Sequence, residues 1–155
     1  MVDISLLKEL HEKCAGRVRY KLGAKASLSA QSSDITHIDC SGYVRWILAR
    51  ASRQTLLLPD GSQNQREWVV RQAADGEGWK ALQRYSDVQY AAQDPSRLFV
   101  AFLWPNPGKA WPRHVWLVHK GRTIESAGGG MKGVGSQDWR AYAAHKNVQC
   151  FEILQ

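Results

Sequence analysis

Two residues of this sequence, Cys40 and His114, are a pair that could perform nucleophilic chemistry. Apolar residues recur at helical spacing over 39–51, so we expect the Cys40 thiol in the first turn of a buried helix. Unpaired backbone N–H groups and the helix dipole favour a thiolate there, and the same N–H groups could stabilise an oxyanion. Ser41 and Gly42 follow and leave room for a substrate carbonyl. The start of this helix therefore predicts an accessible nucleophile.

Asp39, immediately before the cysteine, complicates that prediction. Its negative charge would disfavour the thiolate unless the carboxylate turns to cap the helix. A free cysteine is also commonly a small buried hydrophobe with no chemical role. The helix pattern alone does not separate these interpretations, so the partner of Cys40 matters more than the cysteine itself.

A histidine at the start of a predicted strand is the natural base for this thiol. Side chains along 114–119 alternate between two faces, so His114 and His119 cannot both reach Cys40 without a bulge. His114 leaves a proline-rich loop at the beginning of the strand and is the better placed. Glu125, on the next short strand, is a carboxylate that could fix the imidazole tautomer. We therefore expect Cys40, His114 and Glu125 to be the catalytic residues.

The cysteines and histidines permit two other arrangements. A zinc site with His37, Cys40 and one later histidine is conceivable, but the spacing lacks a matching second pair. Cys14 and Cys150 could form a disulfide if an N-terminal helix lies on a C-terminal strand, which would leave Cys40 free.

The elements that must position these residues change character along the chain. Apolar residues from Leu6 to Val18 fit one face of a helix with Ser5 as its cap, and 65–74 can form a further short helix. The glycine in HKGR at 119–122 suits a hairpin turn. Helices followed by a mainly antiparallel sheet predict an α+β fold, in a single domain over residues 1–155. Four apolar, β-prone runs are expected as strands: 98–104, 114–119, 122–126 and 148–154.

The composition excludes some classes of protein. A chain of 155 residues with 44% hydrophobic and 10% aromatic residues has enough apolar material for a core. Its net charge of +7 predicts attraction to polyanions, but no nucleic-acid-binding motif accompanies that charge. The first residues, MVDISLLKELHEKC, have neither the apolar run of a signal peptide nor the length of a membrane span. We expect no nucleic acid or membrane as a partner.

The segment DCSGYVRWIL at 39–48 resembles the nucleophile motif of the NlpC/P60 family of cysteine peptidases. Tyr20 with the Leu-Gly-Ala at 22–24 is similar to residues before that motif in the family, and the Leu-Pro at 58–59 to residues after it. The run PRHVWLVHKGR at 112–122 resembles the family's catalytic strand, although Arg113 stands where glycine is usual. The resemblance covers about Tyr20 to Val134, and the glycine-rich stretch after Glu125 is similar to that of some members.

This resemblance implies a papain-like α+β enzyme that hydrolyses bacterial peptidoglycan stem peptides. The implied bond joins D-glutamate to a diamino acid, and it is cleaved through a thioester on Cys40 with His114 as base. Glu125 occupies the third polar position, and no metal or organic cofactor is required. We expect five residues, three of them next to Cys40, to contact substrate: Tyr20, Asp39, Ser41, Gly42 and Trp111.

Two other functions stay open on the sequence. One is a cell-wall-binding or phage structural module that has this fold and little or no catalysis. The other is a thiol hydrolase of an amide outside peptidoglycan. For the peptidoglycan enzyme we expect a monomer made in the cytoplasm that reaches the cell wall or periplasm by non-classical export, injection or lysis. An inhibitor or immunity protein is a possible partner.

Overall fold

The computed structural model describes residues 1–103 and 114–155. Three α-helices come first: α1 (Ile4–Cys14), α2 (Cys40–Ala51) and α3 (Ser62–Asp75). The strands follow: β1 (Trp79–Ala81), β2 (Leu98–Leu103), β3 (His114–His119), β4 (Arg122–Ala127), β5 (Gly133–Gly135) and β6 (Val148–Ile153). This order confirms the predicted α+β class. None of the helices in the described part of the chain is long and apolar enough to cross a membrane.

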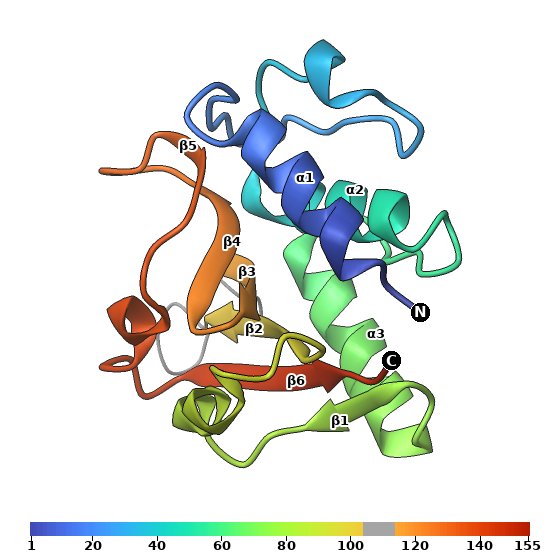
Figure 1. Cartoon of the computed structure of the whole chain (residues 1–155), viewed down its shortest axis with the longest axis vertical. Helices are drawn as coiled ribbons and strands as arrows, with labels where there is room; N and C mark the ends of the chain where they lie inside the picture. Colours follow the sequence, from blue (N-terminus) through green and yellow to red (C-terminus); the bar gives the residue numbers. More distant parts are fainter. Residues whose placement is uncertain (104–113) are drawn as a thin grey trace.

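The strands of the described residues form one six-stranded sheet in the order β1-β6-β2-β3-β4-β5 (Figure 1). Every neighbouring pair is antiparallel, and the central strand β2 is buried along its whole length. The hairpin between β3 and β4 turns at Lys120 and Gly121, whose φ angles are 49° and 73°. Two-residue hairpin loops favour such positive φ values, so the predicted turn in HKGR is confirmed.

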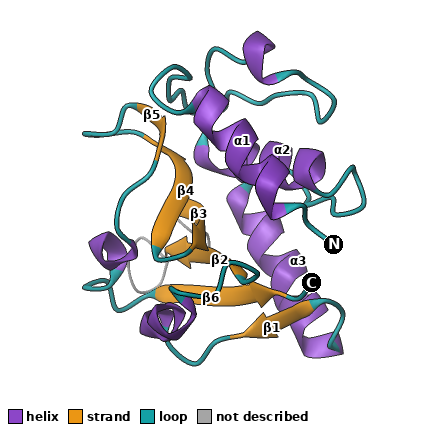
Figure 2. Ribbon diagram, in the orientation of Figure 1, coloured by secondary structure: helices purple, strands orange, loops and turns teal. Residues whose placement is uncertain are grey.

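The sheet lies between two layers of helix (Figures 1 and 2). The three α-helices cover one face, where Trp46 and Ile47 of α2 pack with Leu117 of β3. Two short 3-10 helices, Tyr85–Ala91 and Trp139–Tyr142, lie on the other face, where Tyr85 packs against Trp116. A third, Ser32–Asp34, lies in the loop before α2. Alternation along β3 therefore places its odd and even residues in two separate apolar clusters.

The start of α1 differs from the prediction. Asp3, and not Ser5, caps the helix, because its side chain accepts a hydrogen bond of 3.0 Å from the backbone N–H of Leu6. The helix thus begins at Ile4 and ends at Cys14, before Val18. Its buried face also includes His11, a polar residue that the apolar pattern does not reveal.

Two short edge strands, β1 and β5, have no clear signal in the sequence. β5 forms because the segment around Val18 runs close beside it: the N–H of Val134 donates to the carbonyl of Val18 at 2.9 Å. The N–H of Tyr20 donates to the carbonyl of Lys132 at 3.1 Å. A Cβ atom added to Gly133 would overlap the carbonyl oxygen of Val18. Gly133 therefore permits the approach that places Tyr20 near the sheet.

We expect Gly133→Ala to destabilise the protein by about 2 kcal/mol or more, because backbone atoms must move to admit the methyl group. Urea denaturation followed by circular dichroism measures the loss. Gly130→Ala is the matched control, since its added Cβ meets nothing within 4 Å and its φ is not in the left-handed region. Equal stability of the two variants would contradict the close approach at Gly133.

Candidate active site

Cys40 is the first residue of α2, as the sequence predicts, and its side chain is 8% exposed. Asp39 caps the helix by accepting a hydrogen bond of 2.7 Å from the N–H of Gly42. The N–H of Cys40 has no hydrogen-bond partner in the described residues, as is usual at the first position of a helix. The thiol therefore lies at the positive end of the α2 dipole, beside a free backbone donor.

A lysine compensates the charge of Asp39. The Lys25 ammonium lies 2.8 Å from both carboxylate oxygens and donates at 2.7 Å to the hydroxyl of Ser41. The N–H of Gly23 donates to the same carboxylate at 3.1 Å. The carboxylate is thus turned into the cap and neutralised, which removes the objection that its charge would disfavour a thiolate at Cys40. Nothing in the sequence marks Lys25 for this role.

Asp39, Ser41 and Gly42, which the sequence predicts to contact substrate, face other parts of the protein. Asp39 and Ser41 are buried, and each uses its side-chain oxygens in the cluster with Lys25. A Cβ atom on Gly42 would lie 3.0 Å from an oxygen of Asp39. Gln65 of α3 holds the same turn by donating from Nε2 to the carbonyl of Ser41 at 2.9 Å. These positions fit a structural role at the start of α2.

His114 and Glu125 lie together on β3 and β4. The Nε2 atom of His114 is 3.8 Å from Oε2 of Glu125, a distance typical of an ion pair and longer than a hydrogen bond. Both atoms are buried, and neither has a hydrogen-bond partner in the described residues. Glu125 is fully buried, so its charge depends on the few polar groups around it.

Two residues that the sequence does not single out hold Glu125 in place. The hydroxyl of Tyr142 and Nε2 of Gln137 donate to Oε1 of Glu125 at 2.9 and 3.0 Å. The ring of Tyr142 also stacks on Trp116, with centroids 4.1 Å apart, and its centroid is 5.6 Å from that of His114. One carboxylate oxygen is therefore fixed by two donors, and the other is left for His114.

The surroundings of His114 favour its charged form. Burial opposes the imidazolium, but Cys40 and Glu125 outweigh burial and raise the pKa of His114 to about 9. His114 therefore carries a proton at neutral pH when Cys40 is a thiolate. A buried imidazolium between a thiol and a carboxylate can give a proton to a leaving group and later take one from water.

Tyr20 borders the space next to His114. Both residues line an open pocket of about 490 Å³ with Leu103, Gly128 and Tyr142. The Tyr20 ring packs on Gly128, where an added Cβ would lie 3.4 Å from it. Burial, followed by the negative charges of Cys40 and Asp39, raises the pKa of the Tyr20 hydroxyl. Trp111, the other predicted substrate contact, lies outside the described residues.

The other histidines near the predicted site are not part of it. His119 is at the far end of β3, where Nε2 donates to the carbonyl of Pro95 at 3.0 Å. His37 is exposed, and its Nδ1 lies 3.2 Å from the hydroxyl of Thr36. Over 1–103 and 114–155, no group of three or more His, Cys, Asp or Glu residues could hold a metal ion.

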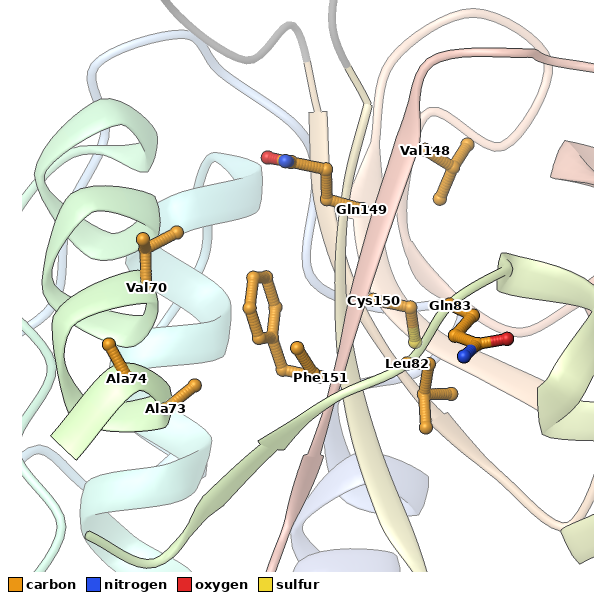
Figure 3. Close-up of a pocket in the computed structure, with 10 residues that line it drawn as sticks. Val70, Ala73, Ala74, Leu82, Gln83, Val148, Gln149, Cys150 and Phe151 are labelled. Carbon is orange, nitrogen blue, oxygen red and sulfur yellow. The ribbon is translucent and has the colours of Figure 1, made fainter. Parts of the chain in front are cut away.

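The disulfide between Cys14 and Cys150, which the sequence left open, does not form, because all three cysteines are free. Cys14 packs on the helix side of the sheet and Cys150 on the opposite side. Figure 3 shows the reason: Phe151 on β6 points toward α3, while its neighbour Cys150 points the other way, toward Leu82. Cys150 lines a second pocket of about 410 Å³, whose walls include Gln83 and Gln149 besides apolar side chains, and burial raises the pKa of Cys150. Cys150 is therefore no rival nucleophile.

Comparison of sequences finds no relative of this chain. No protein-family model matches it, and no curated protein matches it either.

Comparison of structures finds the NlpC/P60 fold. A lipoprotein-like NLP/P60 family protein from Staphylococcus aureus aligns with 99% of this chain at 15% identity and a TM-score of 0.60. RipD of Mycobacterium tuberculosis, described as a non-catalytic NlpC/p60 domain protein adapted to peptidoglycan binding, aligns with 99% at 12% identity and 0.59. The peptidoglycan hydrolase RipB of the same organism aligns with 99% at 19% identity and 0.58.

This chain covers a different share of the length of each of the three structures. The chain spans 42% of the staphylococcal chain, 65% of RipB and 97% of RipD. The likeness confirms the NlpC/P60 fold that the resemblance implied. Since these neighbours include a hydrolase and a non-catalytic protein, the fold alone does not decide between enzyme and binding module.

We expect NMR titration of the His114 imidazole to give a pKa near 9. In Glu125→Gln and in Cys40→Ala the pKa should fall, because burial then opposes the charge with one partner fewer. The signals of the exposed His37 should not differ among the three proteins. An unchanged His114 titration in both variants would contradict the pairing described above.

Proposed function

We propose that this chain, which has the NlpC/P60 fold, is a cysteine hydrolase that cleaves an amide bond in peptidoglycan stem peptides. Cys40 is the nucleophile, His114 the acid and base, and Glu125 the residue that stabilises the charged His114. One observation carries the proposal: a thiol at a helix start together with a largely buried histidine that lies 3.8 Å from the carboxylate of the fully buried Glu125.

The first half of the reaction forms a thioester. The Cys40 thiolate attacks the amide carbonyl, and the carbonyl π electrons move to oxygen. The free N–H of Cys40 at the start of α2 is a donor for that oxyanion. When the carbon–nitrogen bond breaks, the imidazolium of His114 gives its proton to the departing amine. The products of this step are a free amine, a neutral His114 and an acyl group on the Cys40 sulfur.

The second half restores the enzyme. Neutral His114 takes a proton from water while the oxygen of that water attacks the thioester carbonyl. The carbon–sulfur bond breaks, the acid product leaves, and Cys40 is again a thiolate beside an imidazolium. Glu125 stabilises the imidazolium through its charge at 3.8 Å, and burial of the pair strengthens this attraction.

The choice of peptidoglycan as substrate rests on two observations. RipB, with the same fold, is a peptidoglycan hydrolase, and RipD is described as adapted to binding peptidoglycan. The net charge of +7 would also favour contact with an anionic wall. The finer prediction, cleavage between D-glutamate and a diamino acid, comes from the sequence resemblance and is part of this proposal.

A binding module is the second candidate. RipD is non-catalytic, and this chain spans nearly its whole length. Such a protein would bind peptidoglycan whether or not Cys40 is present. The catalytic proposal is favoured because the chain retains Cys40 together with the buried His114 and Glu125 pair.

Digestion of purified peptidoglycan by wild-type protein and Cys40→Ala tests this function. Wild type should release stem-peptide fragments, and the variant should be slower by roughly a thousandfold or more. Mass spectrometry of the fragments identifies the bond. Cys14→Ala and Cys150→Ala are matched controls, since each removes a free, buried cysteine that has no part in the proposed reaction. Both should retain most activity.

The outcomes separate the candidate functions. Binding to sacculi by wild type and Cys40→Ala alike, without fragments from either, would favour the binding module. Activity of wild type on a neutral peptide amide but not on muropeptides would favour the thiol hydrolase of another substrate.

Tyr142→Phe should lower kcat about tenfold, because Glu125 loses one of two donors and becomes less fixed. The alkaline limit of the pH–rate profile should also move below the wild-type value near pH 9, since a displaced carboxylate stabilises the imidazolium less. Tyr90→Phe is the control, because Tyr90 is 72% exposed and outside the site. A variant with normal kcat and an unmoved profile would show that Tyr142 does not act through Glu125.

A further inference from the structure

A further pocket lies on the helix side of the sheet, between α1 and the β3–β4 hairpin, and charged side chains line it together with the apolar Ile124. Its volume is about 260 Å³, and five basic side chains line it together with one carboxylate. These six residues are Lys8, His11 and Glu12 from α1, and His119, Lys120 and Arg122 from the hairpin. The proposed reaction uses none of them.

Hydrogen bonding fixes the proton of His11. The hydroxyl of Tyr43 is fully buried and lies 2.8 Å from Nδ1 of His11, its only partner in the described residues. Nδ1 is the one acceptor that this buried hydroxyl has in the described residues, so a satisfied hydroxyl proton requires that Tyr43 donates to Nδ1. Neutral His11 must then carry its own proton on Nε2, which has no partner in the described residues. His11 is thus a donor without being charged.

His119 is held with the opposite outcome, because its free nitrogen, Nδ1, has no proton in the neutral ring and accepts instead of donating. Its Nε2 must be protonated, because it lies 3.0 Å from the carbonyl of Pro95, which can only accept. Its other nitrogen, Nδ1, makes no hydrogen bond within the described residues. Arg122 donates one N–H to the carbonyl of Ser136 at 3.2 Å, so the rest of its guanidinium is available.

The charges of this pocket do not balance. Lys8, Lys120 and Arg122 carry permanent positive charges, and Glu12 is the one carboxylate among the lining residues. Neither lysine forms an ion pair within the described residues. Asp138 lies near Arg122, but its carboxylate pairs with Arg140 at 3.2 Å. An excess of about two positive charges remains, which a dianion would neutralise.

We propose that this pocket, hereafter the α1–hairpin pocket, binds the phosphate group of a phosphorylated ligand. A phosphate monoester offers several acceptor oxygens and up to two negative charges, which match donors that converge from α1 and from the hairpin. The pocket exceeds the volume of a phosphate alone, so it also admits the group that carries the phosphate. The ligand is therefore a small organic phosphate or the phosphate-bearing end of a larger molecule.

This pocket is distinct from the space next to His114, although the charge of Glu125 acts on His11. His114 begins β3 and His119 ends it, so the two lie roughly 16 Å apart at the usual rise of a strand. The side chains also point to opposite faces of the sheet, because their positions differ by an odd number. A ligand in the α1–hairpin pocket would not occupy the space next to His114. Binding of phosphate there does not require the proposed hydrolase activity.

NMR of the imidazole groups, with glycerol phosphate and with inorganic phosphate as probes, tests the proposal at constant ionic strength. Signals of His11 and His119 should shift saturably, while those of the exposed His37 and His145 should not. Lys8→Gln with Lys120→Gln should weaken binding about tenfold, because two charged donors are lost. The control is Lys80→Gln with Lys132→Gln.

The control pair has the same loss of charge at exposed positions, and Lys132 shares the positive φ of Lys120, 56° against 49°. Its affinity should change less than about twofold. Co-sedimentation with phosphatidylglycerol vesicles, against phosphatidylcholine vesicles, distinguishes a lipid headgroup from a soluble phosphate as the source. Binding to phosphatidylglycerol vesicles should depend on charge if a lipid headgroup is the source of the phosphate. Weaker binding in the Lys8 and Lys120 double variant, but not in the control pair, would support that source.

Two results would overturn the proposal. One is the absence of saturable His11 or His119 shifts with both soluble probes, together with equal vesicle binding by the two double variants. The other is binding of phosphate with the same affinity in wild type and in the Lys8 and Lys120 double variant.

Discussion

The buried carboxylate of Glu125 is the constraint on which the rest of the site depends. A fully buried charge is costly unless other groups hydrogen-bond to it or balance it. Tyr142 and Gln137 satisfy one oxygen, and His114 lies nearest to the other. The stack of Trp116 on Tyr142 holds the ring whose hydroxyl donates to Glu125. The positions of Tyr142, Gln137 and His114 therefore follow from the need to compensate the buried charge of Glu125.

The start of α2 obeys the same electrostatic rule, because a second carboxylate is compensated there. Asp39 would be an unwelcome neighbour for a thiolate, but Lys25 and the helix N–H groups take up its charge. The Lys25 ammonium, the Asp39 cap and the Cys40 thiol therefore lie together at the start of α2.

Periodicity made most of the fold predictable, since α2, the strands from β2 to β4, and β6 all bury strongly patterned apolar residues. β1 and β5 were not predictable, because three-residue strands are determined by the chain that runs beside them. In the site, Cys40, His114 and Glu125 have signals in residue type and element position. Lys25, Gln137 and Tyr142 have none, because only the folded chain brings loops next to Asp39 and Glu125.

The short edge strands have a consequence for how the molecule behaves in concentrated solution. A long sheet edge with unpaired backbone groups invites another chain to add a strand, which begins aggregation. Here one edge is β1, a strand of three residues with Lys80 in its middle, and at the other end of the sheet the segment around Val18 is hydrogen-bonded to the outer side of β5. The apolar strands β2 and β3 are enclosed between them. Self-association through the sheet is therefore disfavoured, although the interior strands are among the most apolar parts of the sequence.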